Sequence, residues 1–276
     1  MRLENLRERI DEIDRELLVL LDERMDLALL TRGLKGSIED RGREAAVLER
    51  ARRIPLSRLG EEFTAGLFAG ILEESKRLQR ESGALVAFQG EHGAYGEVGA
   101  RRMVPDGAHI PRRGFAEVIS GVATGVFDMG VVPVENSTAG PVEQVVELLA
   151  RTPLRVVEEE VVGIRHCLLA LPGVGLRDVA RAYSHKQALG QCGGFLERNG
   201  IEPAPFYDTA GAARMIARNR PEGAAAIAGE GCADLYGLRI LARDLEDVEG
   251  NATRFLLLTR PGDDAEARGA QGRAEP

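Results

Sequence analysis

The chain has 276 residues, of which 44% are apolar and 29% are charged, so it is long enough to bury a substantial core. Its formal net charge of -8 disfavours a broad nucleic-acid or acidic-membrane surface, and no apolar run predicts a membrane span or an export signal. Three cysteines without a CxxC pair indicate neither a disulfide framework nor a zinc site, so we expect a cytoplasmic protein.

Residues 3–35 are predicted to form one long helix, because apolar residues recur at alternating spacings of three and four. Arg24 occupies the missing step of that series. A guanidinium stays charged, so among apolar neighbours it needs an anion from the protein or from a ligand. The apolar positions are Leu6, Ile10, Ile13, Leu17, Leu20 and Leu27.

Two shorter helices follow, one capped by Asp40 and running to about Arg53, the other beginning near residues 57–60. The third helix turns Ser75 and Gln79 inward together, on the side that also carries its apolar residues, Leu67 among them. These two helices are too short to cover the stripe of the first helix. Pairing with a second copy of the chain would cover it, so a homodimer is expected.

After Gly83 the sequence pattern changes: segments typical of strands alternate with segments typical of helices. This alternation favours α/β units with parallel strands. Four polar or glycine-rich stretches, at 90–96, 133–140, 184–192 and 251–255, fall where such a fold binds ligands. Taken singly, they are also ordinary capping and turn sequences, and none has the GxGxxG pattern of a dinucleotide site. Residues 262–276 lack periodicity, and we expect a disordered tail there.

In the helical part, cations lie beside hydrogen-bonding groups, an arrangement that suits a small dicarboxylate. The simpler alternative is that most of them are solvated surface charges. The residues concerned are Arg7, Arg24, Lys35, Arg43, Glu44, Ser75 and Gln79.

Residues 3–80 resemble the all-helical chorismate mutases, through the Leu6–Ile10 start, Glu23-Arg24, Lys35, Asp40-x-x-Arg43-Glu44 and Ser75-x-x-x-Gln79. The resemblance implies an intertwined dimer in which Arg7 reaches into the partner's pocket. It assigns the substrate carboxylates to Arg24 and Arg43, the ether oxygen to Lys35 and Gln79, and the ring hydroxyl to Glu44. Asp40 and Ser75 complete the chorismate site.

The chemistry fits these residues, because the rearrangement of chorismate to prephenate needs neither a nucleophile nor a proton transfer. Charge gathers on the ether oxygen in the transition state, where fixed donors stabilise it selectively. No cofactor and no metal are implied.

Residues 84–260 resemble the catalytic domain of prephenate dehydratase, through Glu-Asn-Ser-x-x-Gly at 135–140, Ser-His-x-Gln-Ala-Leu-x-Gln-Cys at 184–192 and Thr253-Arg254-Phe255. The resemblance implies two α/β lobes similar to those of periplasmic binding proteins, with prephenate between them. We expect one lobe at about 84–160 plus 245–261 and the other at 161–244. The implied site residues are Glu135, Asn136, Ser137, Ser184, His185, Gln187, Thr209, Asn251, Thr253, Arg254 and Phe255.

By this resemblance, the Thr253 hydroxyl supports the leaving ring hydroxyl as a proton or hydrogen-bond donor, and His185 is a candidate relay behind it. Arg254 either binds the pyruvyl carboxylate or pairs with Glu135. The chain departs from the family pattern at Glu91, Ala94, Gly96, Lys186 and Gly229.

The chain thus resembles a bifunctional enzyme of phenylalanine synthesis. Because 18 residues follow Leu258, we expect no dedicated phenylalanine-binding regulatory domain. One alternative is a chorismate mutase fused to a prephenate sensor without dehydratase activity. Another is a transcription regulator with a helical DNA-binding head, which the acidic charge and Arg24 disfavour. We expect no nucleic-acid and no membrane partner.

Overall fold

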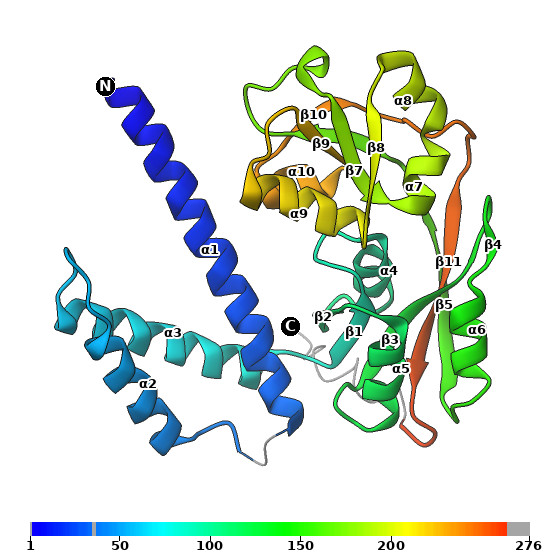
Figure 1. The fold of residues 1–276 in the computed structure, drawn as a ribbon. Coiled ribbons are helices and arrows are strands. Elements are labelled where there is room, and N and C mark those ends of the chain that lie inside the picture. The colour runs from blue at the N-terminus through cyan, green and yellow to red at the C-terminus, as the bar shows by residue number, and fades with distance from the viewer. Residues whose placement is uncertain (1, 35–36, 264–276) are drawn as a thin grey trace, which may run out of the picture. The chain divides into compact units, whose positions relative to one another are not determined.

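The computed structural model describes residues 2–34 and 37–263, and the chain divides after Gly83 into two compact units (Figure 1). Within these ranges, no helix is both long enough and apolar enough to cross a membrane. Lys35 and the predicted tail from residue 264 onward lie outside the described residues.

The first unit is helical, with α1 (Leu3–Leu34), α2 (Arg41–Arg53) and α3 (Glu61–Glu81). Asp40 caps α2 as predicted, because its carboxylate accepts a hydrogen bond from the Arg43 backbone nitrogen at 2.9 Å. At the other end of the unit, Arg32 donates to the Ser82 carbonyl at 2.7 Å and so satisfies the C-terminal turn of α3.

The apolar stripe of α1 is largely uncovered within one chain. Ile10 is 56% exposed and Leu17 is 54% exposed, whereas Leu29 is buried. Leu67 of α3, which the sequence predicted to be buried, is 47% exposed. The buried face of α3 instead contains Thr64, Ala65, Ser75 and Gln79.

The second unit contains two sheets, which we call the first and second lobes. The sheet of the first lobe has the strand order β2-β1-β3-β11-β5, with β4 beside β3. Helices α4 and α5 pack on its central strands β1 and β3. Its elements are β1 (Leu85–Gln89), α4 (Tyr95–Met103), β2 (Ala108–Arg112), α5 (Phe115–Ala123), β3 (Met129–Asn136), β4 (Gly140–Pro141), α6 (Glu143–Leu149), β5 (Arg155–Gly163) and β11 (Ala252–Thr259).

The sheet of the second lobe has the order β10-β6-β9-β7-β8. Neighbouring residues of its central strand, β9, point to opposite faces of the sheet. Ala226 belongs to the hydrophobic cluster around α9, and Ile227 belongs to the cluster that includes residues of α7 and α8. The elements are β6 (Cys167–Ala170), the 3-10 turn η1 (Leu176–Asp178), β7 (Arg181–His185), α7 (Lys186–Gln191), α8 (Gly193–Asn199), β8 (Glu202–Phe206), α9 (Thr209–Asn219), β9 (Ala224–Ala228), α10 (Gly231–Tyr236) and β10 (Arg239–Ala242).

The prediction of parallel strands is right for part of each sheet only. Strands β1, β2 and β3 are parallel, as are β7, β8 and β9, but β11 is antiparallel to both neighbours and β6 to both of its own. The reason is that the chain crosses between the lobes twice, from β5 to β6 and from β10 back to β11. The two crossings are joined by a hydrogen bond from the Ile164 nitrogen to the Asn251 carbonyl at 2.8 Å.

Candidate active sites

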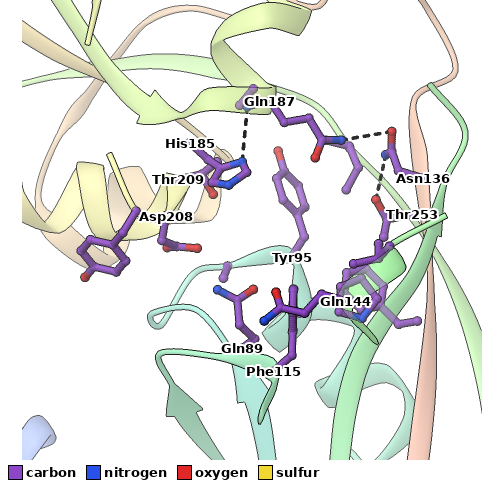
Figure 2. A pocket seen from close by; sticks show the side chains of 18 of the residues that line it. Gln89, Tyr95, Phe115, Asn136, Gln144, His185, Gln187, Asp208, Thr209 and Thr253 are labelled. Carbon is purple, nitrogen blue, oxygen red and sulfur yellow. Dashed lines mark hydrogen bonds between the residues drawn. The ribbon is translucent and has the colours of Figure 1, made fainter. Parts of the chain in front are cut away.

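A cavity of about 380 Å³ lies in the second unit and is lined by residues of both lobes. Most of its polar lining comes from the carboxyl ends of parallel strands, which is where α/β sheets present ligand-binding groups. Gln89 ends β1, Asn136 ends β3, and His185 ends β7. Figure 2 shows Asn136 and Thr253 on one side of the cavity and His185, Asp208 and Thr209 on the other, with Tyr95 between them.

Asn136 is the centre of the hydrogen-bond network in the cavity and is 6% exposed. Its Oδ1 accepts from the backbone nitrogens of Thr138 and Ala139 at 3.1 and 3.0 Å. Its Nδ2 donates to Asn251 Oδ1 at 2.8 Å and to Thr253 Oγ1 at 2.9 Å. The backbone donors fix the orientation of the amide, because only an oxygen can face them.

Thr253 therefore receives a hydrogen bond and keeps its own proton. Its oxygen accepts from Asn136, and no acceptor for its hydroxyl proton lies within hydrogen-bonding distance among the described residues. The side chain lines the cavity. A hydroxyl polarised by a donor on its oxygen is a better donor to a ligand.

The walls of the cavity combine apolar rings with one cation. Tyr95, Phe115 and Phe255 line it, and Phe255 is 4% exposed. Among the described lining residues, Arg113 is the one arginine or lysine, and its guanidinium carbon lies 5.4 Å from the centre of the Tyr207 ring. The cavity thus suits a ring that carries a carboxylate.

Two titratable groups of the second lobe also reach the cavity. Burial raises the pKa of Asp208 to about 6, although its carboxylate accepts from the Gly211 nitrogen at 2.7 Å and caps α9. Desolvation lowers the pKa of His185, which caps α7 by accepting from the Gln187 nitrogen at 3.3 Å. His185 lies across the cavity from Thr253 (Figure 2), and within the described residues no hydrogen bond joins the two, so the predicted relay has no direct contact.

The structure brings six of the predicted prephenate residues to the cavity and places five others elsewhere. Arg254 and Glu135 do not line it, because Arg254 alternates with Thr253 and Phe255 along β11 and points to the other face. There Arg254 pairs with Glu135 and Glu159, both at 3.0 Å. The residues that line the cavity are Asn136, His185, Gln187, Thr209, Thr253 and Phe255.

The other three outlying residues are structural. Ser137 accepts from the Ala252 nitrogen at 3.0 Å, which ties β3 to β11. Ser184 is fully buried and donates to the Ile227 carbonyl at 2.5 Å, which ties β7 to β9. Asn251 is buried, and its Oδ1 accepts a hydrogen bond from Nδ2 of Asn136, which helps to hold the Asn136 amide in place.

Three of the five departures from the family pattern, Glu91, Ala94 and Gly96, lie at the start of the first lobe. Ala94 and Gly96 line the cavity, and a side chain at Gly96 would approach the Gln89 carbonyl to 3.1 Å. Glu91 forms hydrogen bonds with the second lobe, because its carboxylate accepts from Tyr207 and Arg214, both at 2.6 Å. The Glu91 carboxylate therefore connects the first lobe to the second.

In the helical unit, Arg24 meets the polar side of α3. Its guanidinium donates to Ser75 Oγ at 2.6 Å, and desolvation lowers its pKa. One turn further along, the Gln79 amide donates to the Ala28 carbonyl at 2.5 Å and to Thr31 Oγ1 at 3.0 Å. The expected anion for Arg24 is therefore not supplied by Ser75, which offers only a neutral oxygen.

The remaining predicted chorismate residues are more dispersed. Glu44 pairs with Lys76 at 3.0 Å, and this contact lowers the pKa of the carboxylate. Arg7 and Arg43 are exposed. Asp40 is occupied as the cap of α2.

Several lining residues were not named among the sequence-predicted site residues. Arg113 and Phe115 follow β2, and Tyr207 and Asp208 follow β8, so their places after strands were the available signal. Gln191 belonged to a quoted motif, but His166 had no signal at all. Within residues 2–34 and 37–263, no three His, Cys, Asp or Glu side chains are grouped to hold a metal ion. The added residues are Gln89, Tyr95, Arg113, Phe115, Gln144, His166, Gln191, Tyr207 and Asp208.

Two family models match the chain: prephenate dehydratase over residues 86–263 and chorismate mutase type II over residues 6–80. Among similar proteins, an arogenate dehydratase/prephenate dehydratase 2 of Arabidopsis thaliana is 42% identical over 175 residues, 63% of this chain and 46% of that protein. Arogenate dehydratase 2 of Petunia hybrida is 38% identical over 75% of this chain and 52% of its own length. This chain therefore spans about half the length of these relatives.

Among solved structures, a prephenate dehydratase of Arthrobacter aurescens in complex with L-Phe is 31% identical, with a TM-score of 0.60. The match covers 64% of this chain and 61% of that chain.

Proposed function

Because this chain belongs to the prephenate dehydratase family, with a chorismate mutase type II domain before it, we propose that it catalyses two consecutive reactions. The helical unit converts chorismate to prephenate. The second unit converts prephenate to phenylpyruvate, carbon dioxide and water. The observation that carries the second assignment is the Asn136–Thr253 contact in a cavity lined by aromatic rings.

In the dehydratase step, the bond between the ring and its carboxylate breaks, and its electron pair moves into the ring. The ring hydroxyl leaves from the opposite carbon, and aromatisation drives the step. The departing oxygen needs a donor, because hydroxide is a poor leaving group. We assign this role to Thr253, and the contact with Asn136 supports it, because Asn136 donates to the Thr253 oxygen and leaves the hydroxyl proton for the substrate.

Charge and shape support the same orientation of prephenate. Phe115 and Phe255 offer apolar surface to the ring, and Arg113 offers its guanidinium to a carboxylate. The ring carboxylate gains nothing from a cation, because its charge must disperse as carbon dioxide forms. Arg113 is therefore assigned to the pyruvyl carboxylate.

Arogenate is a second candidate substrate, and the observation that favours it is Asp208. Arogenate carries an ammonium group where prephenate has a keto oxygen. A carboxylate with a pKa of about 6 is mostly ionised at pH 7.5 and attracts that ammonium. Comparing kcat/KM for the two substrates in the wild-type protein and in Asp208→Asn, which keeps a capping side chain, separates them: the variant loses mainly arogenate turnover if the ammonium is recognised there.

The mutase assignment is supported by the Arg24–Ser75 and Gln79 contacts at one side of α3. We propose that Arg24 binds a substrate carboxylate and that Gln79 donates to the ether oxygen. For this the Gln79 amide exchanges its bond to Thr31 or to the Ala28 carbonyl for one to the substrate, because these two acceptors take both of its protons in this structure. Arg43, Glu44 and Lys35 complete the pocket. Arg7 does so from a second copy of the chain, because its place on the exposed part of α1 suits a contact with a partner.

The direct test is to incubate purified protein with prephenate at neutral pH and measure phenylpyruvate. The proposal expects formation far above the spontaneous rate. A protein that binds prephenate without accelerating this reaction is a sensor fused to a mutase, and that outcome would refute the dehydratase assignment.

A further inference from the structure

A continuous series of hydrogen bonds runs from His166 to Thr253. His166 Nε2 lies 3.1 Å from Gln191 Oε1, and Gln191 Nε2 donates to Thr138 Oγ1 at 2.7 Å. Thr138 Oγ1 donates to Asn136 Oδ1 at 2.7 Å, and Asn136 Nδ2 donates to Thr253 Oγ1 at 2.9 Å. The series thus connects His166, which lies in the first crossing between the lobes, to Thr253, the proposed donor.

The direction of each bond follows from two backbone groups. The backbone nitrogens of Thr138 and Ala139 fix Oδ1 of Asn136 as an acceptor. The Thr138 hydroxyl must therefore donate its single proton to that oxygen. Thr138 Oγ1 can then only accept from Gln191, which must present its nitrogen.

The same reasoning fixes the tautomer of His166. With the nitrogen of Gln191 directed at Thr138, its oxygen faces His166, so Nε2 of His166 carries the hydrogen. His166 is 2% exposed, and its buried Nδ1 has no hydrogen-bond partner in the part of the chain that the structure describes, so a proton there would be an unpaired buried donor. Burial lowers the pKa of His166, in agreement with a neutral ring.

We propose that His166 is a positioning residue for the dehydratase reaction: its Nε2–H holds Gln191 in the orientation that the backbone donors to Asn136 require, and so keeps the Thr138 hydroxyl donating to Asn136 beside Thr253. This inference rests on the proposed function of Thr253. With all donors aligned, the Thr253 oxygen is an acceptor within the protein, and its proton is free for the departing hydroxyl. If the Gln191 amide rotated by 180°, its oxygen would face Thr138. The Thr138 hydroxyl would then donate to Gln191 instead of to Asn136 Oδ1, and Asn136 would lose that hydrogen bond.

Two substitutions distinguish hydrogen bonding from packing. His166→Phe keeps a ring beside Tyr95, whose centre lies 5.9 Å from that of His166, but removes the donor. His166→Gln keeps an N–H near Nε2 but removes the ring. We expect kcat for prephenate to fall about tenfold or more in the phenylalanine variant, with KM nearly unchanged and most activity retained in the glutamine variant. The opposite order, with phenylalanine active and glutamine inactive, would show a packing role and overturn the proposal.

A matched control and a double-mutant cycle sharpen the result. His109 is also buried, bonds the Val104 carbonyl through Nε2, and does not line the cavity, so His109→Phe should leave kcat unchanged. His166→Phe and Thr138→Val break the same series, so their effects on kcat should not add. Fully additive losses would mean that His166 does not act through Thr138.

Nitrogen NMR tests the arrangement without turnover. The chain has four histidines, so single substitutions assign their signals. The proposal expects a neutral Nε2–H tautomer for His166, and a changed signal in Gln191→Leu. An Nδ1–H tautomer, or a signal indifferent to Gln191, would overturn it. If the wild-type protein makes no phenylpyruvate, the proposed function fails, and these signals still decide whether the series exists.

Discussion

At Thr253, a valine keeps the branched shape of the side chain and removes only the hydroxyl. Because that hydroxyl is the proposed donor to the leaving oxygen, we expect Thr253→Val to lower dehydratase kcat about 100-fold or more. Thr253→Ser, which keeps a hydroxyl, should retain much more activity. Measured with prephenate as substrate, a valine variant with full activity would make Thr253 a packing residue and move the donor role elsewhere.

At Arg24, the guanidinium contacts Ser75, and no carboxylate pairs with it among residues 2–34 and 37–263, so a substrate carboxylate is the expected partner. Arg24→Ala should therefore reduce chorismate turnover about 100-fold or more while dehydratase activity on added prephenate continues. Arg15→Ala, an exposed position on the same helix, serves as the control. Normal mutase activity in Arg24→Ala would contradict the helical pocket.

At Glu97, pH should reveal a buried carboxylate that stabilises the fold. It accepts from His92, Arg101 and the Gly93 nitrogen, and these contacts hold its pKa at about 2 against a burial effect that raises it. A folded-state pKa below the ordinary 4.5 means that the stabilisation is present above pH 4.5 and is lost as the pH falls through about 2.

The shift corresponds to about 3 kcal/mol of unfolding free energy, so Glu97→Gln should lose that amount at pH 7. The difference from wild type should shrink below pH 4.5 in denaturant titrations. The exposed Glu117→Gln is the control. A pH-independent difference would show that the loss comes from packing or hydrogen bonding rather than from charge.

Single residues also show how far the sequence leads to the site. Asn136 and Thr253 were predicted from their motifs and lie together in the cavity. For Arg254 the sequence left two alternatives, and the structure shows the pair with Glu135. The sequence did not say which face of the strand meets the cavity, because alternation along a strand sends neighbours to opposite faces. His166 has no motif; its partners are distant in the chain and are found only once the fold brings them together.

Among the elements, α1 carries the clearest untested prediction. Its stripe of Leu6, Ile10, Ile13, Leu17 and Leu20 is between 42% and 56% exposed, more apolar surface than a monomer usually leaves on one helix. A second copy packed on this stripe would bury it.

We therefore expect Leu17→Glu to shift the protein from dimer to monomer in light scattering and to reduce mutase activity sharply. Arg15→Glu introduces the same side chain on the other side of the helix and should leave the dimer intact. A wild-type monomer with full mutase activity would contradict the prediction.

The elements themselves were largely predictable, and their pairing was not. Helices α1 and α2 end close to the predicted residues, because periodicity and the Asp40 cap are local signals. The antiparallel return of β11 between β3 and β5 is decided by the two crossings between lobes, which no local pattern records. Strand β9, with four alanines in five residues, is a strand because both faces are covered, against the helical preference of alanine.

At the scale of the whole molecule, the chain joins a mutase-type helical unit to a dehydratase-type unit, so the product of one proposed site is the substrate of the other. Each unit has its own pocket residues, and the substitutions above should separate the reactions. Arg24→Ala should abolish formation of prephenate, whereas Thr253→Val should let prephenate accumulate.

The most direct measurement supplies chorismate to the purified wild-type protein and quantifies chorismate, prephenate and phenylpyruvate in the same sample over time. We expect chorismate to disappear, prephenate to pass through a maximum, and phenylpyruvate to account for the chorismate consumed. Prephenate that accumulates while phenylpyruvate forms only at the spontaneous rate would contradict the dehydratase assignment, and unconsumed chorismate would contradict the mutase assignment.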